Sequence, residues 1–305
     1  MAVIPTPDSS LAGAPDQTLR QHAQMPADGT PGVVLALGGG FSRGFAHLGV
    51  LEVLEQERIP IVGIVGTSIG SLLGAAFADG IPIHELCELG RRVRVRDFIR
   101  FHRSQPTAQK NDRIGQFVRE WFRSSRVEEL SIPTAIVTTD LDACSPYVFT
   151  QGPLDVAIRA SCAYPGLFEP VEYEGRMLAD GCIVAPVPTA LAAQIHAGCV
   201  LGVAVNSDVG NAAFACNVVQ ASDRANDAPR GKLISSSWTR EADVMLEPDV
   251  QGIGWSDFSR VDEAHAAGAE AMRRALSCVR EFLARRSEQA AMAGIPNQFA
   301  HRMVS

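Results

Sequence analysis

Residues 59–78, IPIVGIVGTSIGSLLGAAFA, carry no charged side chain. About 18 apolar residues can cross a bilayer, but this stretch contains Pro60, four glycines and the hydroxyl groups of Thr67, Ser68 and Ser71. Its first half is short and β-branched, as in a buried strand, whereas its second half has small and long residues at helical spacing. We therefore predict a strand, an abrupt glycine turn and a helix, with Ser68 at the turn.

The composition limits the class of protein. The chain has 305 residues, 46% of them hydrophobic, and a formal net charge of −7. This length suits one large α/β domain or two modest ones, and the negative charge argues against a general affinity for nucleic acid. The seven cysteines have no C-x-x-C spacing and do not cluster with histidine, so we expect reduced thiols, no metal and no cofactor. The N-terminus lacks the pattern of a secretory signal, which predicts a cytoplasmic protein.

Patterning predicts one folded domain between two tails. Residues 1–30 are rich in Pro, Asp, Gln, Ser and Ala without periodicity, which is typical of a disordered tail. We predict a catalytic domain over residues 31–290 and a C-terminal tail over residues 291–305. Within the domain, residues 207–240 are the least patterned and are interpreted as a variable insertion or lid.

Two strand–helix units follow one another near the start of this domain. The segment VVLALGGG (33–40) is typical of a buried strand that runs into glycines, and the next segment has apolar residues at 45, 48, 51 and 54. The second unit is the stretch quoted above, and such repeats favour a parallel sheet covered by helices. Further along, PVEYEGRMLAD (170–180) predicts a hairpin that turns at Glu174–Gly175. A long helix is expected from Ser259, with that serine as its N-cap.

The pattern G-x-S-x-G surrounds Ser68, with Gly66 and Gly70 as its glycines. Between a strand and a helix, this pattern holds a serine on a sharp turn with its hydroxyl group exposed, and a Cβ at either glycine would clash. The alternative is ordinary packing of small residues. The strand–turn–helix context favours a nucleophile.

A second glycine loop, GGGFSRG (38–44), also joins a strand to a helix. It departs from the dinucleotide fingerprint because Arg43 stands where a glycine is needed, and it lacks the Gly-Lys-Ser/Thr of a phosphate-binding loop. The other interpretation is an oxyanion hole, in which the N–H groups of Gly39 and Gly40 stabilise charge on an attacked carbonyl. Arg43 would then anchor the loop or bind a phosphate.

Asp180 and Gly181 follow a predicted strand. An Asp-Gly pair is common in ordinary turns, but a serine nucleophile needs a proton acceptor, and Asp180 is a candidate for that base. Because a carboxylate is a weaker base than an imidazole, we expect this group to be partly desolvated. The residues alone leave the two interpretations open.

Four ordered segments, GGGFSRGFAHLGVL, GTSIGS, ASCAYPGLFEPV and ADGCIVAPVP, resemble the patatin-like phospholipase family, and the resemblance extends from about residue 33 to 268. It implies a three-layer α/β/α fold with a mostly parallel sheet, and hydrolysis of lipid acyl esters by a Ser-Asp dyad without histidine. By this resemblance Ser68 is the nucleophile and Asp180 the base, while Gly38, Gly39 and Gly40, with Arg43, form the oxyanion loop. The chain departs from the family pattern at Cys182 and Ala185.

Two rival functions stay open at this stage. An α/β-hydrolase with a Ser-Asp-His triad would use His196 or His265, although only one clear strand precedes the serine turn. A non-catalytic lipid- or phosphate-binding protein would keep the scaffold without an activated hydroxyl.

An arginine-rich segment, RRVRVRDFIRFHR (91–103), stands out in this acidic chain. It is interpreted either as a solvated helix face or as a patch through which Arg91, Arg92, Arg94 and Arg96 meet anionic lipid headgroups. The second interpretation predicts peripheral contact with a membrane. The sequence does not indicate an oligomeric state.

Overall fold

A computed structural model describes residues 32–93, 111–195, 198–205 and 241–292. The predicted N-terminal tail, the insertion at 207–240 and nearly all of the predicted C-terminal tail lie outside these residues. So do His196 and most of the arginine-rich segment, including Arg94 and Arg96.

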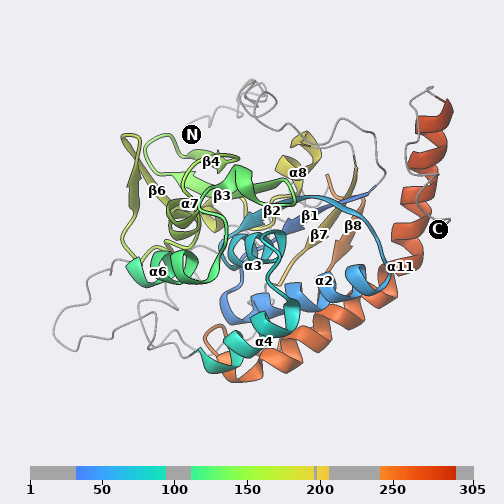
Figure 1. Ribbon diagram of the computed structural model, residues 1–305, viewed down its shortest axis with the longest axis horizontal. Coiled ribbons are helices and arrows are strands. Elements are labelled where there is room, and N and C mark those ends of the chain that lie inside the picture. The colour runs from blue at the N-terminus through green and yellow to red at the C-terminus, as the bar shows by residue number, and fades with distance from the viewer. Residues whose placement is uncertain (1–31, 94–110, 196–197, 206–240, 293–305) are drawn as a thin grey trace, which may run out of the picture.

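A single eight-stranded sheet forms the centre of the molecule (Figure 1). Its order is β5-β6-β3-β2-β1-β7-β8, and β4 also pairs with β3. The strands that pair in parallel are β1 (Val33–Leu37), β2 (Ile61–Thr67), β3 (Thr134–Asp140), β7 (Cys199–Val203) and β8 (Val244–Leu246). The antiparallel strands are β4 (Ser145–Phe149), β5 (Val171–Tyr173) and β6 (Arg176–Asp180). The prediction of a mostly parallel sheet is therefore confirmed.

The hairpin at the antiparallel end turns where the sequence predicted. Tyr173 pairs with Arg176, which leaves Glu174 and Gly175 as a two-residue loop. Both loop residues have positive φ, 48° and 73°, as hairpin turns that match the twist of the strands require. This hairpin places Asp180 at the end of β6, next to β3.

The helices follow the strands in the expected alternation. In chain order they are the 3-10 turn η2 (Phe41–Phe45), α2 (Ala46–Gln56), α3 (Ile69–Ala78), α4 (Ile83–Arg92), α6 (Asp112–Trp121), η3 (Val127–Glu129), α7 (Leu154–Ser161), η4 (Gly181–Ile183), α8 (Thr189–Ile195), η6 (Phe258–Arg260) and α11 (Val261–Met292). The stretch of residues 59–78 becomes β2 and α3, and none of the described helices is long and apolar enough to span a bilayer.

The start of the last helix differs from the prediction. Ser259 is not its N-cap, because it lies inside the 3-10 turn η6 that leads into α11. Asp257 caps this turn instead, and its carboxylate accepts a hydrogen bond from the Ser259 N–H at 3.1 Å. An aspartate two residues earlier competes for the same role, since Asp and Ser are both strong N-cap residues.

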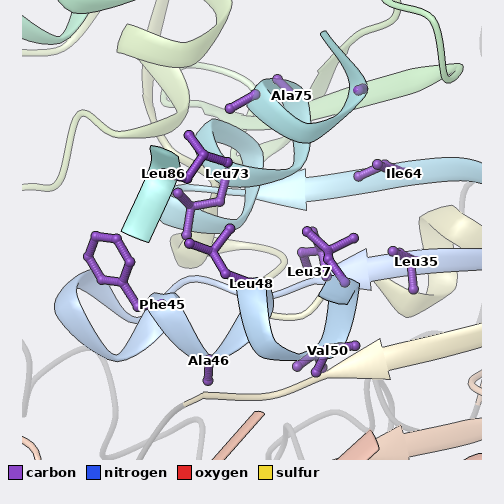
Figure 2. Packing of buried hydrophobic residues seen from close by; sticks show 14 of the residues in the cluster. Leu35, Leu37, Phe45, Ala46, Leu48, Val50, Ile64, Leu73, Ala75 and Leu86 are labelled. Atoms are coloured by element: carbon purple, nitrogen blue, oxygen red, sulfur yellow. The ribbon is translucent and has the colours of Figure 1, made fainter. Parts of the chain in front are cut away.

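Alternate residues of β1 face two separate hydrophobic cores. Leu35 and Leu37 pack into the larger core with α2, α3 and α4, where Figure 2 shows their side chains among those of Leu48 and Leu73. Ala36, on the other face, packs against α8 in the smaller core. A strand covered on both faces is buried throughout, which explains its unbroken apolar sequence. The result is the predicted three-layer α/β/α architecture.

Helices α2 and α11 run side by side on the larger core (Figure 1). Each of the two helices has a glycine at the point where it meets the backbone of the other. A Cβ at Gly49 of α2 would collide with the backbone carbonyl of His265, and one at Gly268 of α11 would collide with that of Ala46. The long C-terminal helix thus lies directly against the helix that follows the glycine loop.

Candidate active site

Ser68 stands alone between the last residue of β2 and the first residue of α3. Its φ of 54° and ψ of −124° lie outside the regions that a residue with a Cβ normally adopts. A methyl group at Gly66 would lie 2.6 Å from the Ser71 nitrogen, and one at Gly70 would collide with the Leu37 carbonyl. The two glycines of the motif are therefore required by contact with neighbouring backbone, and the strained turn is the one the sequence predicted.

The structure brings Ser68 and Asp180 together from positions 112 residues apart. Ser68 Oγ donates a hydrogen bond of 2.6 Å to Asp180 Oδ2. Asp180 is 1% exposed and Ser68 is 8% exposed, so the pair is largely removed from water. A hydroxyl group held on a buried carboxylate is arranged to give up its proton when it attacks an electrophile.

Three hydrogen bonds hold Asp180 in place, two at its backbone and one at its carboxylate. Its N–H donates to the Ala163 carbonyl at 3.0 Å, and its carbonyl accepts from Thr139 Oγ1 at 2.8 Å. The second carboxylate oxygen, Oδ1, accepts a hydrogen bond of 2.8 Å from the Cys182 N–H. The turn after Asp180 forms although Cys182 departs from the family pattern, because the contact uses the backbone and not the side chain of that residue.

Ser161 is a site residue that sequence reasoning missed. Its buried hydroxyl group accepts a hydrogen bond from the Ser68 N–H at 2.8 Å and donates one to the Val137 carbonyl at 2.7 Å. It thereby holds the strained backbone of Ser68 to β3. The only signal in the sequence is the position of Ser161 inside the third matching segment, ASCAYPGLFEPV.

The glycine loop lies beside Ser68, since a methyl group at Gly39 would come within 3.2 Å of Ser68 Cβ. Two of its N–H groups bond within the protein: Gly38 donates to the Val203 carbonyl at 3.1 Å and Gly39 to the Pro186 carbonyl at 3.0 Å. Among the residues that the structure describes, the Gly40 N–H has no acceptor. Of the three glycines, Gly40 therefore keeps a donor available for a bound oxyanion.

Arg43 and Ser42 attach the glycine loop to the segment before α11. Arg43 Nε donates to the Ile253 carbonyl at 2.8 Å. Ser42 Oγ lies 2.8 Å from the carbonyls of both Gly254 and Trp255. Of the two roles considered for Arg43, these contacts favour the anchor over a phosphate ligand.

Ser68 is one of the residues that line an apolar pocket. Apart from Ser68 and Cys162 its lining is hydrocarbon and glycine, contributed by residues of η2, α3, α4, α6 and η6 together with Val93 and Phe168. Cys162 is only partly exposed, and desolvation raises the pKa of its thiol, so this sulfur stays protonated at neutral pH and is a poor candidate for a nucleophile. The pocket has the character required to hold a hydrocarbon chain next to the Ser68 hydroxyl group.

The histidines do not form a triad in the described residues. His265, one of the two candidates, lies on α11 with its Nε2 3.4 Å from a carboxylate oxygen of Glu52. His196, the other, lies outside the described residues. The ring of His47 instead faces the glycine loop, with Nε2 2.7 Å from the Gly38 carbonyl oxygen.

The chain resembles several known proteins in sequence. An uncharacterised NTE family protein of Mycobacterium tuberculosis is 38% identical over 187 residues, which are 60% of this chain and 52% of the relative. Lysophospholipase NTE1 of Mycosarcoma maydis is 34% identical over 229 residues, or 72% of this chain and 12% of the relative. The chain thus matches about half the length of the mycobacterial protein and a small part of the fungal one.

Among solved structures, VipD from Legionella pneumophila aligns with a TM-score of 0.47 and 12% identity, over 83% of this chain and 67% of that one. The sequence model of the patatin-like phospholipase family matches residues 35–193. This range is about half of the chain and contains the glycine loop, Ser68, Ser161 and Asp180. The chain therefore belongs to the patatin-like phospholipase family.

Proposed function

We propose that the protein is a serine acyl hydrolase that cleaves carboxylic ester bonds of lipids, of the phospholipase A, lysophospholipase or esterase type. The observation that carries the proposal is the 2.6 Å hydrogen bond from Ser68 Oγ to Asp180 Oδ2. Ser68 also lines an apolar pocket, so an acyl chain in the pocket would have its ester carbonyl near Ser68 Oγ. Membership of the family and the resemblance to a lysophospholipase support the same substrate class.

The reaction follows from these positions. Asp180 takes the proton of Ser68 Oγ as the oxygen attacks the ester carbonyl, and the Gly40 N–H stabilises the negative charge that develops on the carbonyl oxygen. Asp180 then gives the proton to the leaving alcohol, and an acyl group remains on Ser68. A water molecule then loses a proton to Asp180 and attacks the acyl group. Asp180 returns this proton to Ser68 Oγ as the acyl–oxygen bond breaks and the fatty acid is released. An alkoxide leaves more readily than an amide anion, which favours esters over peptides as substrates.

Hydrolysis of p-nitrophenyl esters tests the dyad. We expect Ser68→Ala and Asp180→Asn each to lower kcat by at least about 10³-fold, because the nucleophile or its base is lost. Ser145→Ala and Asp142→Asn, at β4 and in the exposed turn before it, serve as matched controls and should keep the wild-type rate. A folded Asp180→Asn variant with the wild-type rate would refute the base assignment.

A fluorophosphonate probe separates this proposal from its non-catalytic rival. A binding protein on the same scaffold has no activated hydroxyl, so it would not be labelled. We expect wild-type protein to be labelled at Ser68 and Ser68→Ala to remain unlabelled. Loss of activity on replacing His196 or His265 would instead favour a triad.

Peripheral contact with a membrane is a separate part of the proposal. Arg91 pairs with Asp262 at 2.7 Å, and Arg92 lies 3.6 Å from Glu88, so both guanidinium groups already have acidic neighbours. Both keep large exposed fractions, 48% and 76%. We expect co-sedimentation with vesicles that contain anionic lipid, weakened by salt. Equal sedimentation with neutral vesicles would contradict it.

A further inference from the structure

The buried histidine beside the glycine loop has no part in the dyad. His47 is the second residue of α2 and is 0% exposed. Its Nε2 lies 2.7 Å from the Gly38 carbonyl oxygen, while its Nδ1 is buried without a hydrogen-bond partner in the described residues. Burying a polar atom without a hydrogen-bond partner is unfavourable. An apolar side chain would fill the same space without this cost, which indicates that His47 does more than fill space.

The partner of Nε2 determines the tautomer of the ring. A carbonyl oxygen only accepts hydrogen bonds, so Nε2 must carry the proton and donate. The neutral ring then has Nδ1 as an unused acceptor. Burial also lowers the pKa of His47 to about 4, and the bond to Gly38 only partly offsets this effect. The ring is therefore a neutral donor at neutral pH.

The carbonyl that His47 holds belongs to a peptide unit that is fixed at both ends. The N–H of the same unit, on Gly39, donates to the Pro186 carbonyl at 3.0 Å. Pro186 lies in the loop that follows Asp180. The carbonyl also lies against the serine turn, because a methyl group at Gly70 would be only 2.7 Å from the Gly38 oxygen. The unit thus joins the oxyanion loop, the base loop and the nucleophile turn.

The next peptide unit along the chain presents the Gly40 N–H. Glycine residues on both sides allow this unit to rotate with little steric resistance, so its direction depends on how the preceding unit is held. A donor that points a few tenths of an ångström away from the developing oxyanion loses much of its effect, since this kind of stabilisation depends on preorganisation.

We propose that His47 is a positioning residue for ester hydrolysis, whose Nε2–H holds the Gly38 carbonyl and so aims the Gly40 N–H at the oxyanion. The inference rests on the proposed function. His47 touches neither the substrate nor Ser68, and its effect passes through the glycine loop. Its loss should therefore lower kcat and leave substrate binding in the apolar pocket unchanged.

Four variants test the inference with p-nitrophenyl esters. We expect His47→Leu, which removes the donor at similar volume, to lower kcat about 10- to 100-fold with KM within about twofold, somewhat less than the loss of an oxyanion donor itself. His47→Gln places an amide N–H near the original Nε2 and should recover most of kcat. His47→Asn carries the same amide on a shorter side chain that does not reach Gly38, and it should stay slow. His84→Leu, at an exposed position of α4, is the matched control.

The contrast between the glutamine and asparagine variants decides the result if the leucine variant does not fold. Equal kcat in the two amide variants, or a wild-type kcat in folded His47→Leu, would overturn the inference and leave His47 as a packing residue. These outcomes are distinct from failure of the dyad. If the dyad proposal itself fails, wild-type protein is inactive or Ser68→Ala is active, whatever residue 47 is.

Discussion

At the scale of single residues, the site depends on backbone groups that are held by side chains far away in the sequence. Ser161 holds the N–H of Ser68 across 93 positions, and Thr139 holds the carbonyl of Asp180 across 41. Each of these groups is buried, so losing its partner leaves an unsatisfied donor or acceptor at a cost of about 1–3 kcal/mol. Ser68 and Asp180 are thus kept in place by hydrogen bonds from side chains outside the proposed dyad.

The buried ring of His47 predicts a stability that depends on pH. Its pKa is about 4 in the folded protein and 6.5 in an ordinary setting. Between these values the unfolded chain binds more protons, so the contribution is fully present above about pH 6.5 and is lost as the pH falls toward 4. The linkage between proton binding and stability gives a loss of about 2 kcal/mol in the free energy of unfolding as the pH falls from 7.5 to 5.

Urea unfolding at these two pH values measures this contribution. The loss should be smaller by about 2 kcal/mol in His47→Gln than in wild-type protein, because glutamine does not titrate. His84→Leu should behave like wild type, since that histidine is exposed. An equal loss in wild-type protein and His47→Gln would show that other groups cause the whole pH dependence.

At the scale of helices and strands, the contact between α2 and α11 depends on glycine. We expect Gly49→Ala to lower the free energy of unfolding by about 1–3 kcal/mol, because the new methyl group meets the His265 carbonyl and the helices must separate. Alanine is intrinsically the better helix former by about 1 kcal/mol, so an increase in stability would show that the helices are not in close contact. Chemical denaturation measures the difference, and Ser277→Ala, at an exposed position of α11, is the control.

In this protein the local sequence predicts the helices, strands and turns better than it predicts the contacts between them. The hairpin at Glu174–Gly175 and the turn at Ser68 follow from short-range rules, namely the positive φ of a two-residue loop and the crowding around two glycines. The bond between His47 and Gly38 also joins residues close in the chain, but it depends on the angle at which α2 leaves the loop. The cap at Asp257 was missed because Asp257 and Ser259, two residues apart, satisfy the same local rule.

At the scale of the whole molecule, the site is assembled from strand ends that only the sheet brings together. Ser68 follows β2, the glycine loop follows β1, and Asp180 ends β6, which reaches the site because β3 lies between β2 and β6. The four family segments indicated these residues by resemblance, whereas their spacing alone left Asp180 undecided. Ser161 has no local signature as a partner of Ser68, since its role exists only once α7 packs beside β3.

Under the proposed function, the acyl chain of the substrate occupies the apolar pocket, which predicts a preference for chain length. Leu72 of α3 lines the pocket one turn from Ser68. Its replacement by tryptophan should fill space that a long acyl chain needs, while it leaves the dyad in place. We expect Leu72→Trp to lower kcat/KM for p-nitrophenyl laurate at least about tenfold relative to the butyrate, a difference of about 1.4 kcal/mol in binding the longer chain. Leu141→Trp, at an exposed position beyond the end of β3, controls for the added aromatic ring. If the ratio of the two esters is unchanged in Leu72→Trp, the acyl chain does not occupy this pocket during the reaction.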